Sequence, residues 1–179
     1  MMNSRPILIF AEQEDGKIHP VSYELLGKGR DLSDKLETEL CAVLLGQGLY
    51  EWAKELLYYG ADKVFLYDDS SLRDFDVIRY KNNIVKLAEQ IKPSFFLIGA
   101  TRIGRSLAPR IAAALKTGLT ADCVDLKIDE EGNLVQTRPA FSGNIMAQIK
   151  TKTRPQMATV RYKVMKKMEK NTERKDTVV

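Results

Sequence analysis

Short runs of hydrophobic residues alternate along most of this chain with stretches in which hydrophobic residues recur at helical spacing. The continuous runs predict β-strands at residues 5–12, 36–46, 63–69 and 94–100. Helical spacing predicts α-helices at residues 20–30, 49–59, 77–91 and 107–115. Strands that alternate with helices in this way are typical of an α/β fold, in which helices cover both faces of a parallel sheet.

The pattern changes after residue 119, where strand-like segments follow one another without helices between them. These segments are residues 120–129, 133–141, 144–152 and 156–164. Turn-forming residues separate them, and the turn at 141–144 contains Gly143 and Asn144, either of which can adopt the positive φ of a hairpin. We therefore expect a C-terminal antiparallel strand extension added to the parallel core.

The loops that follow parallel strands meet at one edge of a sheet. Right-handed crossovers place loops 11–19, 46–50, 68–76 and 99–106 along the carboxyl edge, which is where ligands bind in open α/β sheets. Candidate binding residues are therefore expected in these loops.

The loop at 99–106 reads GATRIGRS and nearly fits the phosphate-binding pattern GxxxxGK[ST]. Arg105 stands where the pattern needs lysine, whose compact charge a guanidinium does not replace. No acidic strand end is evident as a magnesium ligand. The sequence therefore argues against hydrolysis of a nucleoside triphosphate at this loop.

Two interpretations of this loop stay open. In the first it is purely structural: its glycines permit a sharp turn, Ser106 caps the following helix, and Pro109 lies in the first turn of that helix. In the second, free amide groups and two arginines face an anion or a partner surface. The candidate binding residues of the second interpretation are Gly99, Thr101, Arg102, Gly104 and Arg105.

Two other loop motifs favour turns over binding sites. Gly46-Gln47-Gly48 lacks the third glycine of a dinucleotide fingerprint, so a tight strand-to-helix turn is expected. Asp68 and Asp69 end a predicted strand, where carboxylates can hold a ribose or a metal but more often cap a turn.

The composition narrows the possible chemistry of a chain whose 179 residues suggest one domain. His19 is the single histidine, so neither a metal centre of His and Cys ligands nor a catalytic triad is expected. Cys41 and Cys123 lie in separate strand-like stretches and predict buried free thiols. The net charge of +4 is concentrated in residues 163–179, which predicts a solvated basic tail and no nucleic-acid surface. No hydrophobic run approaches the roughly 20 residues that span a bilayer.

Several blocks of the chain resemble, in order, the N-terminal domain of the electron transfer flavoprotein alpha subunit. They read RPILIFAE, GADKVFL, GATRIGRSLAPRIAAAL, TGLTADC, RPAFSGNIMA and PQMATVR. The resemblance has two departures: Ser142 stands where the family usually has glycine, and Tyr162-Lys163 stands where it usually has a Pro-Gly turn.

The resemblance implies a Rossmann-like domain, akin to the adenine nucleotide alpha-hydrolase group, at residues 1–162, with a charged tail at 163–179. Proteins of this family pair with a beta subunit in a heterodimer that carries FAD. The heterodimer accepts electrons from acyl-CoA dehydrogenase-type flavoenzymes and passes them to an acceptor. A second domain makes most of the FAD contacts, so the resemblance places FAD in the full assembly and not tightly on this chain alone. AMP is possible in the beta subunit.

No catalytic residue of the family maps onto this chain, so the resemblance implies an electron-transfer carrier subunit that is not itself an enzyme. The antiparallel extension carries five hydrophobic residues: Phe141, Ile145, Met146, Ile149 and Met157. Two interpretations stay open. Either some of these residues face outward and form the partner surface, or all of them fill the core. Such a surface makes a homodimer possible when the chain is isolated.

The alternative function is a stand-alone adenine-nucleotide-binding module. The start of the chain, MMNSRPILIF, does not resemble a signal peptide, so a cytoplasmic protein of a bacterium or archaeon is expected in preference to a mitochondrial matrix protein.

Overall fold

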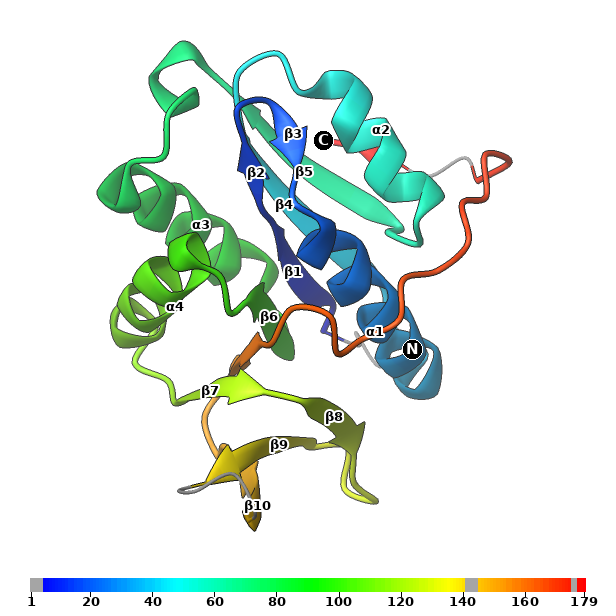
Figure 1. Ribbon diagram of the computed structural model, residues 1–179, viewed down its shortest axis with the longest axis vertical. Coiled ribbons are helices and arrows are strands. Elements are labelled where there is room, and N and C mark those ends of the chain that lie inside the picture. Colours follow the sequence, from blue (N-terminus) through cyan, green and yellow to red (C-terminus); the bar gives the residue numbers. More distant parts are fainter. Residues whose placement is uncertain (1–4, 141–144, 175–176) are drawn as a thin grey trace.

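A computed structural model describes residues 5–140, 145–174 and 177–179 of the chain. Seven parallel strands form its central sheet: β1 (Ile7–Ala11), β4 (Leu40–Gly46), β5 (Lys63–Asp68), β6 (Phe95–Gly99), β7 (Leu119–Cys123), β11 (Gln156–Val160) and β12 (Thr177–Val178). Their order across the sheet is β12-β5-β4-β1-β6-β11-β7 (Figure 1). The predicted α/β fold with a parallel sheet is confirmed.

Two helices cover each face of this sheet. Helices α1 (Pro20–Leu36) and α2 (Tyr50–Tyr58) cover one face, and α3 (Val77–Ile91) and α4 (Arg102–Ala114) cover the other (Figure 1). Two smaller elements lie in the connecting loops. These are a hairpin of β2 (Gln13–Glu14) and β3 (Lys17–Ile18), and a single 3₁₀ turn at Ser70–Leu72.

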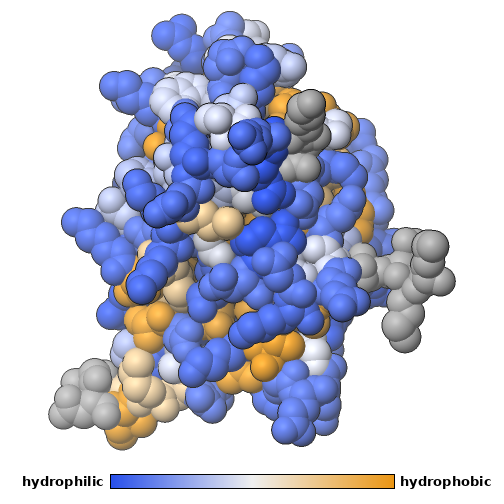
Figure 2. Space-filling view, turned by 90° about the vertical axis from the view of Figure 1, so that its right-hand side faces the viewer, coloured by the Kyte–Doolittle hydropathy of each residue, from blue (hydrophilic) through white to orange (hydrophobic). Residues whose placement is uncertain are grey.

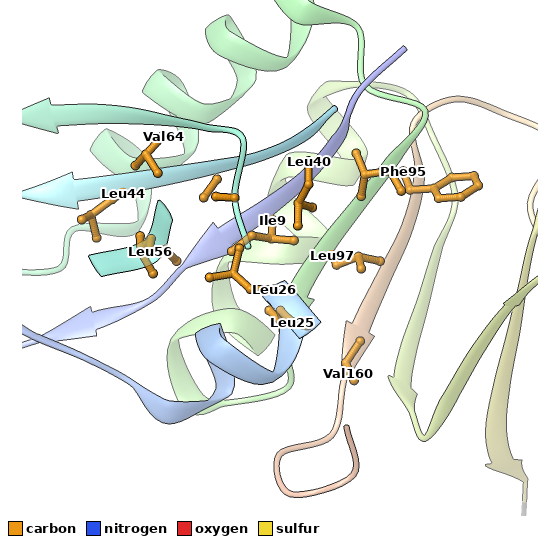
Figure 3. Close-up of a cluster of buried hydrophobic side chains, with 14 of the residues drawn as sticks. Ile9, Leu25, Leu26, Leu40, Leu44, Leu56, Val64, Phe95, Leu97 and Val160 are labelled. Carbon is orange, nitrogen blue, oxygen red and sulfur yellow. The ribbon is translucent and has the colours of Figure 1, made fainter. Parts of the chain in front are cut away.

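The core has two halves because successive side chains of a strand point to opposite faces. Ile9 packs with Leu25 and Leu26 beneath α1 (Figure 3), whereas Leu8 packs with Ile84 on the other face. Every residue of β1 is at most 1% exposed, as expected for a strand covered on both faces.

Two predicted helix boundaries are wrong. Helix α1 continues beyond residue 30 because Leu32 and Ser33 extend its buried face. It ends at Leu36, and the next residue, Glu37, caps it with a left-handed φ of 50°. Strand β4 consequently begins at Leu40 and not at residue 36. Helix α4 begins at Arg102, five residues before the predicted start, because residues 102–106 of the predicted loop form its first turn.

The predicted antiparallel extension is correct only in part. β7 and β11 belong to the parallel sheet, with β11 inserted between β6 and β7, so the assignment of residues 120–123 and 156–160 to the extension is wrong. The antiparallel sheet, called the arm below, contains β8 (Asp125–Ile128), β9 (Leu134–Ala140) and β10 (Ile145–Lys150). The predicted hairpin turn at 141–144 lies outside the described residues.

Two buried glutamine side chains join the arm to the parallel sheet. Gln136 donates from Nε2 to the carbonyl of Met157 at 2.7 Å and accepts the hydroxyl of Thr120, also at 2.7 Å. Gln156 accepts the amide of Leu134 at 2.6 Å. Both glutamines are at most 1% exposed, so these bonds form away from water and hold the arm in one position against the core.

The C-terminal segment does not extend into solvent as the sequence predicted. It runs along α1 and α2 (Figure 1), where the carboxylate of Glu24 accepts the amide of Lys163 at 3.0 Å. At its end β12 pairs with β5, and Val179 exchanges two hydrogen bonds of 2.8 Å with Val64 and Leu66. The basic character of the tail was misleading because two of its cations meet carboxylates of the body: Arg174 contacts Asp62 at 2.8 Å, and Lys170 lies 3.9 Å from Glu55.

Candidate functional site at the carboxyl edge of the sheet

The loops that follow β1, β4, β5 and β6 lie at one edge of the sheet, because these four strands are parallel. Along the chain the order of strands moves outward from β1 to β5 and then returns to β6 on the other side of β1. The carboxyl ends of β1 and β6 therefore flank the topological switch point, which is where ligands bind in open α/β folds.

The glycine-containing loop after β6 has a well-defined geometry. Thr101 is the N-cap of α4, and its hydroxyl accepts the amide of Gly104 at 2.9 Å. A Cβ atom on Gly104 would overlap the carbonyl oxygen of Gly99, so glycine permits the close approach of α4 to the end of β6. Two details of the structural interpretation are wrong: Ser106 is not the cap, and Pro109 lies inside the helix and not in its first turn.

The side chain of Glu12 lies directly across the switch point from Thr101. Glu12 follows β1, is 3% exposed, and accepts the hydroxyl of Thr101 at 2.5 Å. Burial raises the pKa of this carboxyl, and the hydrogen bond from Thr101 opposes the rise. Val21 of α1 closes the other side, because its methyl groups lie against Gly99. The switch point is therefore occupied by side chains of the chain itself.

The two loop arginines are paired with acidic residues. Arg102 lies 3.2 Å from the carboxylate of Glu14, and Arg105 lies 3.4 Å from that of Asp122. Arg161 also contacts Asp122, at 2.6 Å, and its hydrogen bond lowers the pKa of that carboxyl. Both loop arginines are nonetheless largely exposed, at 77% and 64% of the side chain, and they flank the start of α4.

The structure thus brings together the five predicted candidates of this loop. The hydroxyl of Thr101 and the guanidinium groups of Arg102 and Arg105, however, already have partners within the chain. Whether the loop binds an anion stays a prediction. Sequence reasoning missed Glu12 and Asp122, which supply two of those partners. The available signal was their position: Glu12 comes immediately after β1 and Asp122 is the last but one residue of β7, so both fall at the carboxyl edge.

The other predicted motifs form turns. Gly48 has a φ of 69°, and its amide donates to the carboxylate of Asp68 at 2.7 Å. Asp69 caps the 3₁₀ turn by accepting the amide of Ser71 at 2.8 Å. A nearby cavity of about 290 Å³ is lined by polar residues of three edge loops, among them Gln13, Gln47 and Arg73. Gln13 itself is hydrogen-bonded within the fold.

No cluster of metal-ligating side chains occurs in the described parts of the chain. His19 caps α1, because its Nδ1 atom accepts the amide of Val21 at 3.1 Å. Cys41 and Cys123 are buried free thiols, as predicted, and burial raises the pKa of each to about 12. At that pKa neither thiol is a nucleophile near neutral pH. Within the same described residues, no helix has the length and hydrophobicity needed to cross a membrane.

The arm carries exposed hydrophobic side chains. Ile145, Met146 and Ile149 of β10 are 60%, 54% and 36% exposed. Figure 2 shows hydrophobic residues gathered at the level of the arm, at the lower left of the view. Met157 is completely buried in β11, so the alternative of core filling holds for this residue, and Phe141 lies outside the described residues. The arm therefore presents an uncovered hydrophobic strand.

Comparison with known proteins identifies the family. The electron transfer flavoprotein domain matches residues 7–179. The lactate dehydrogenase (NAD(+),ferredoxin) subunit LctC of Acetobacterium woodii is 52% identical over 161 residues, which are 89% of this chain and 38% of that protein. Electron transfer flavoprotein alpha subunits of Thermoanaerobacterium thermosaccharolyticum and Clostridium acetobutylicum are 48% and 51% identical, and the matches span 100% and 92% of this chain.

The chain spans about half the length of the two alpha subunits, of which it covers 54% and 50%, and a smaller share, 38%, of LctC. The match to the family extends through the C-terminal segment, in agreement with its place in the sheet. The chain therefore belongs to the electron transfer flavoprotein family, as an N-terminal domain of the alpha-subunit type.

Proposed function

We propose that this chain is the scaffold domain through which an electron transfer flavoprotein alpha subunit binds its beta subunit. The observation that carries the proposal is the exposed hydrophobic surface of the arm at Ile145, Met146 and Ile149. A monomer normally hides such residues, and interfaces expose them before assembly. The buried bonds of Gln136 and Gln156 hold this surface in a fixed position, which favours binding because little order is lost on association.

The proposed assembly carries FAD, and this domain alone does not hold the cofactor tightly. The filled switch point supports this part of the proposal, because Glu12 and Val21 occupy the place where a dinucleotide would approach the sheet. Purified chain should therefore lack the visible absorbance of oxidised flavin. AMP, if present in the assembly, would belong to the beta subunit.

The proposed role is that of a carrier subunit and not of a catalyst. The donor would be an acyl-CoA dehydrogenase-type flavoenzyme, as in fatty acid β-oxidation. The name of the Acetobacterium woodii relative instead associates that protein with lactate, NAD(+) and ferredoxin. We place the protein in the bacterial cytoplasm, in keeping with its bacterial relatives and its two free thiols.

The alternative function is an adenine-nucleotide-binding module that uses the loop Gly99–Arg105. The exposed guanidinium groups of Arg102 and Arg105 at the start of α4 favour it. A phosphate would have to compete with Glu14 and Asp122 for these arginines. Calorimetric titration with AMP distinguishes the two functions, since only the module should bind it.

Coexpression with a beta subunit from the same organism tests the scaffold proposal. The chain should copurify with that subunit, and Met146→Asp on the arm should abolish copurification without changing the circular dichroism spectrum. Ile78→Asp is the matched control, because Ile78 is 53% exposed on α3, away from the arm. If the wild-type chain fails to copurify and light scattering shows a strict monomer without homodimer, the proposal is wrong.

A further inference from the structure

A cluster of positive charges lies at the amino edge of the sheet, opposite the candidate site. Arg5, Lys92 and Arg154 line a hollow of about 290 Å³. Arg5 and Lys92 also line an adjoining hollow of about 570 Å³, so the two hollows share these two cations. Three separate segments contribute the cations: the residues before β1, the end of α3 and the loop before β11. We call the two hollows together the cationic hollow.

None of the three cations of the cationic hollow forms an ion pair within the described residues. Among the described residues, no carboxylate lies within 4.0 Å of Arg5, Lys92 or Arg154. Arg154 instead donates to the neutral Oδ1 atom of Asn133 at 3.1 Å and lies over the ring of Phe95. The arginine is thus held in place while its charge stays available.

Like charges in the cationic hollow also repel one another. Burial lowers the pKa of Arg154, the neighbouring charge of Arg5 lowers it further, and the negative charge of Asp129 only partly opposes the shift. Lys63, which lines the adjoining hollow, is by contrast paired with Glu39 at 3.4 Å. An anion that entered the cationic hollow would relieve this repulsion, in addition to gaining its own attraction to three cations.

The walls between the charges are largely hydrophobic. Ala88, Pro93, Leu115 and Pro155 line the smaller hollow, and Glu89 is its single acidic residue. A hydrophobic floor with a charged rim is typical of protein interfaces. The amino edge is also not the edge at which α/β sheets bind small ligands, which argues for a protein segment over a nucleotide.

We propose that the cationic hollow docks an acidic segment of a partner protein, whose carboxylates pair with Arg5, Lys92 and Arg154 while its hydrophobic side chains cover Leu115 and the two prolines. The inference is independent of the scaffold function, because none of these residues belongs to the arm. Complementary charge mainly accelerates association and selects the partner, so binding at this surface should depend steeply on salt.

The test uses the whole chain and a fluorescein-labelled peptide of alternating glutamate and leucine, followed by fluorescence anisotropy. The double variant Arg5→Glu/Lys92→Glu should bind the peptide about tenfold more weakly or worse at low salt. Lys35→Glu controls for charge reversal elsewhere, because Lys35 is exposed on α1, which covers the other face of the sheet. Circular dichroism should show the same fold for all three proteins.

Three results would overturn the proposal. They are the absence of peptide binding to the wild-type chain, equal affinity of the double variant and the wild type, and an equal loss of affinity in the Lys35→Glu control. Competition with inorganic phosphate is a further measurement. If phosphate displaces the peptide at the concentration at which phosphate itself binds, and sodium chloride of equal ionic strength does not, the cationic hollow is a small-anion site. The protein-docking proposal is then wrong.

Discussion

The hydroxyl of Thr101 donates a hydrogen bond of 2.5 Å to the carboxylate of Glu12, across 89 positions of the sequence. The same oxygen accepts the amide of Gly104 and so caps α4. One hydroxyl therefore ties the end of β1 to the first turn of the helix that follows β6.

Removal of this hydroxyl should destabilise the fold. We expect Thr101→Val to lower the free energy of unfolding by about 1–2 kcal/mol, because the cap is lost and the carboxylate of Glu12 loses its donor. Urea denaturation followed by circular dichroism measures the change. Thr101→Ser keeps a hydroxyl and should recover most of the stability; equal losses in the two variants would exclude the hydrogen bonds as the cause.

The pH dependence of stability should change when Glu12 is replaced. Because burial raises its pKa above the ordinary 4.5, the ionised carboxyl destabilises the folded state at neutral pH, and this destabilisation disappears as the pH falls below 4.5. Glu12→Gln should therefore be more stable than the wild type at pH 7, and the two should converge near pH 4. Thermal unfolding across this range measures both effects.

Carboxyl groups whose pKa is lowered in the folded state make the fold less stable as the pH falls, which is the opposite of the effect of Glu12. The Glu12→Gln substitution should leave their contribution unchanged. Asp129, whose pKa is lowered to about 2 chiefly by its hydrogen bond to Lys150, stabilises the fold above its ordinary 3.8, and this stabilisation is lost in acid. Both proteins should consequently unfold in strong acid. A constant stability difference between Glu12→Gln and the wild type from pH 4 to pH 7 would contradict the assignment to Glu12.

Truncation of residues 170–179 should lower the melting temperature by about 4–8 °C, corresponding to roughly 2 kcal/mol. The sequence alone predicted a small effect, but the truncation removes β12 from the edge of β5 and Arg174 from Asp62. Differential scanning calorimetry measures the shift. Lys167→Ala, at an exposed position of the same segment, serves as the control and should melt with the wild type.

The attachment of the arm can be tested at Gln136. Gln136→Leu should cost about 1–3 kcal/mol, because the hydroxyl of Thr120 and the carbonyl of Met157 lose their partner away from water. Gln148 is exposed on β10, so Gln148→Leu controls for the loss of an amide. If both variants denature at the same urea concentration, the buried bonds do not hold the arm.

Local patterns in the sequence were sufficient for the parallel core. The hydrophobic runs that became β1 and β6 are buried on both faces, and such runs are informative without knowledge of their neighbours. The start of α4 was missed because Gly99 and Gly104 suggested a loop, whereas the structure uses Gly104 for a close approach between helix and strand. That requirement depends on two segments being brought together and leaves no local signal.

Long-range pairing explains the remaining errors. The position of β11 between β6 and β7 cannot be read from its own residues, since its hydrophobic pattern suits either type of sheet. The partners of the candidate loop were missed for the same reason: Glu12 is 89 positions from Thr101, and Asp122 is 17 positions from Arg105. Charge counts likewise could not show that Arg174 would meet Asp62.

Strand β11 lies beside β7 and parallel to it, so the chain must travel back from the carboxyl edge to the amino edge between them. Helices α1 to α4 make this return between the strands from β1 to β7, but after β7 the three strands of the arm make it. Because neighbouring strands of the arm run in opposite directions, only an odd number of them brings the chain from the carboxyl edge to the amino edge, where β11 begins. Strands can therefore be added to or lost from the arm only in pairs, whereas its hairpin can lengthen residue by residue. The reach of the arm can thus change without disturbing the parallel core.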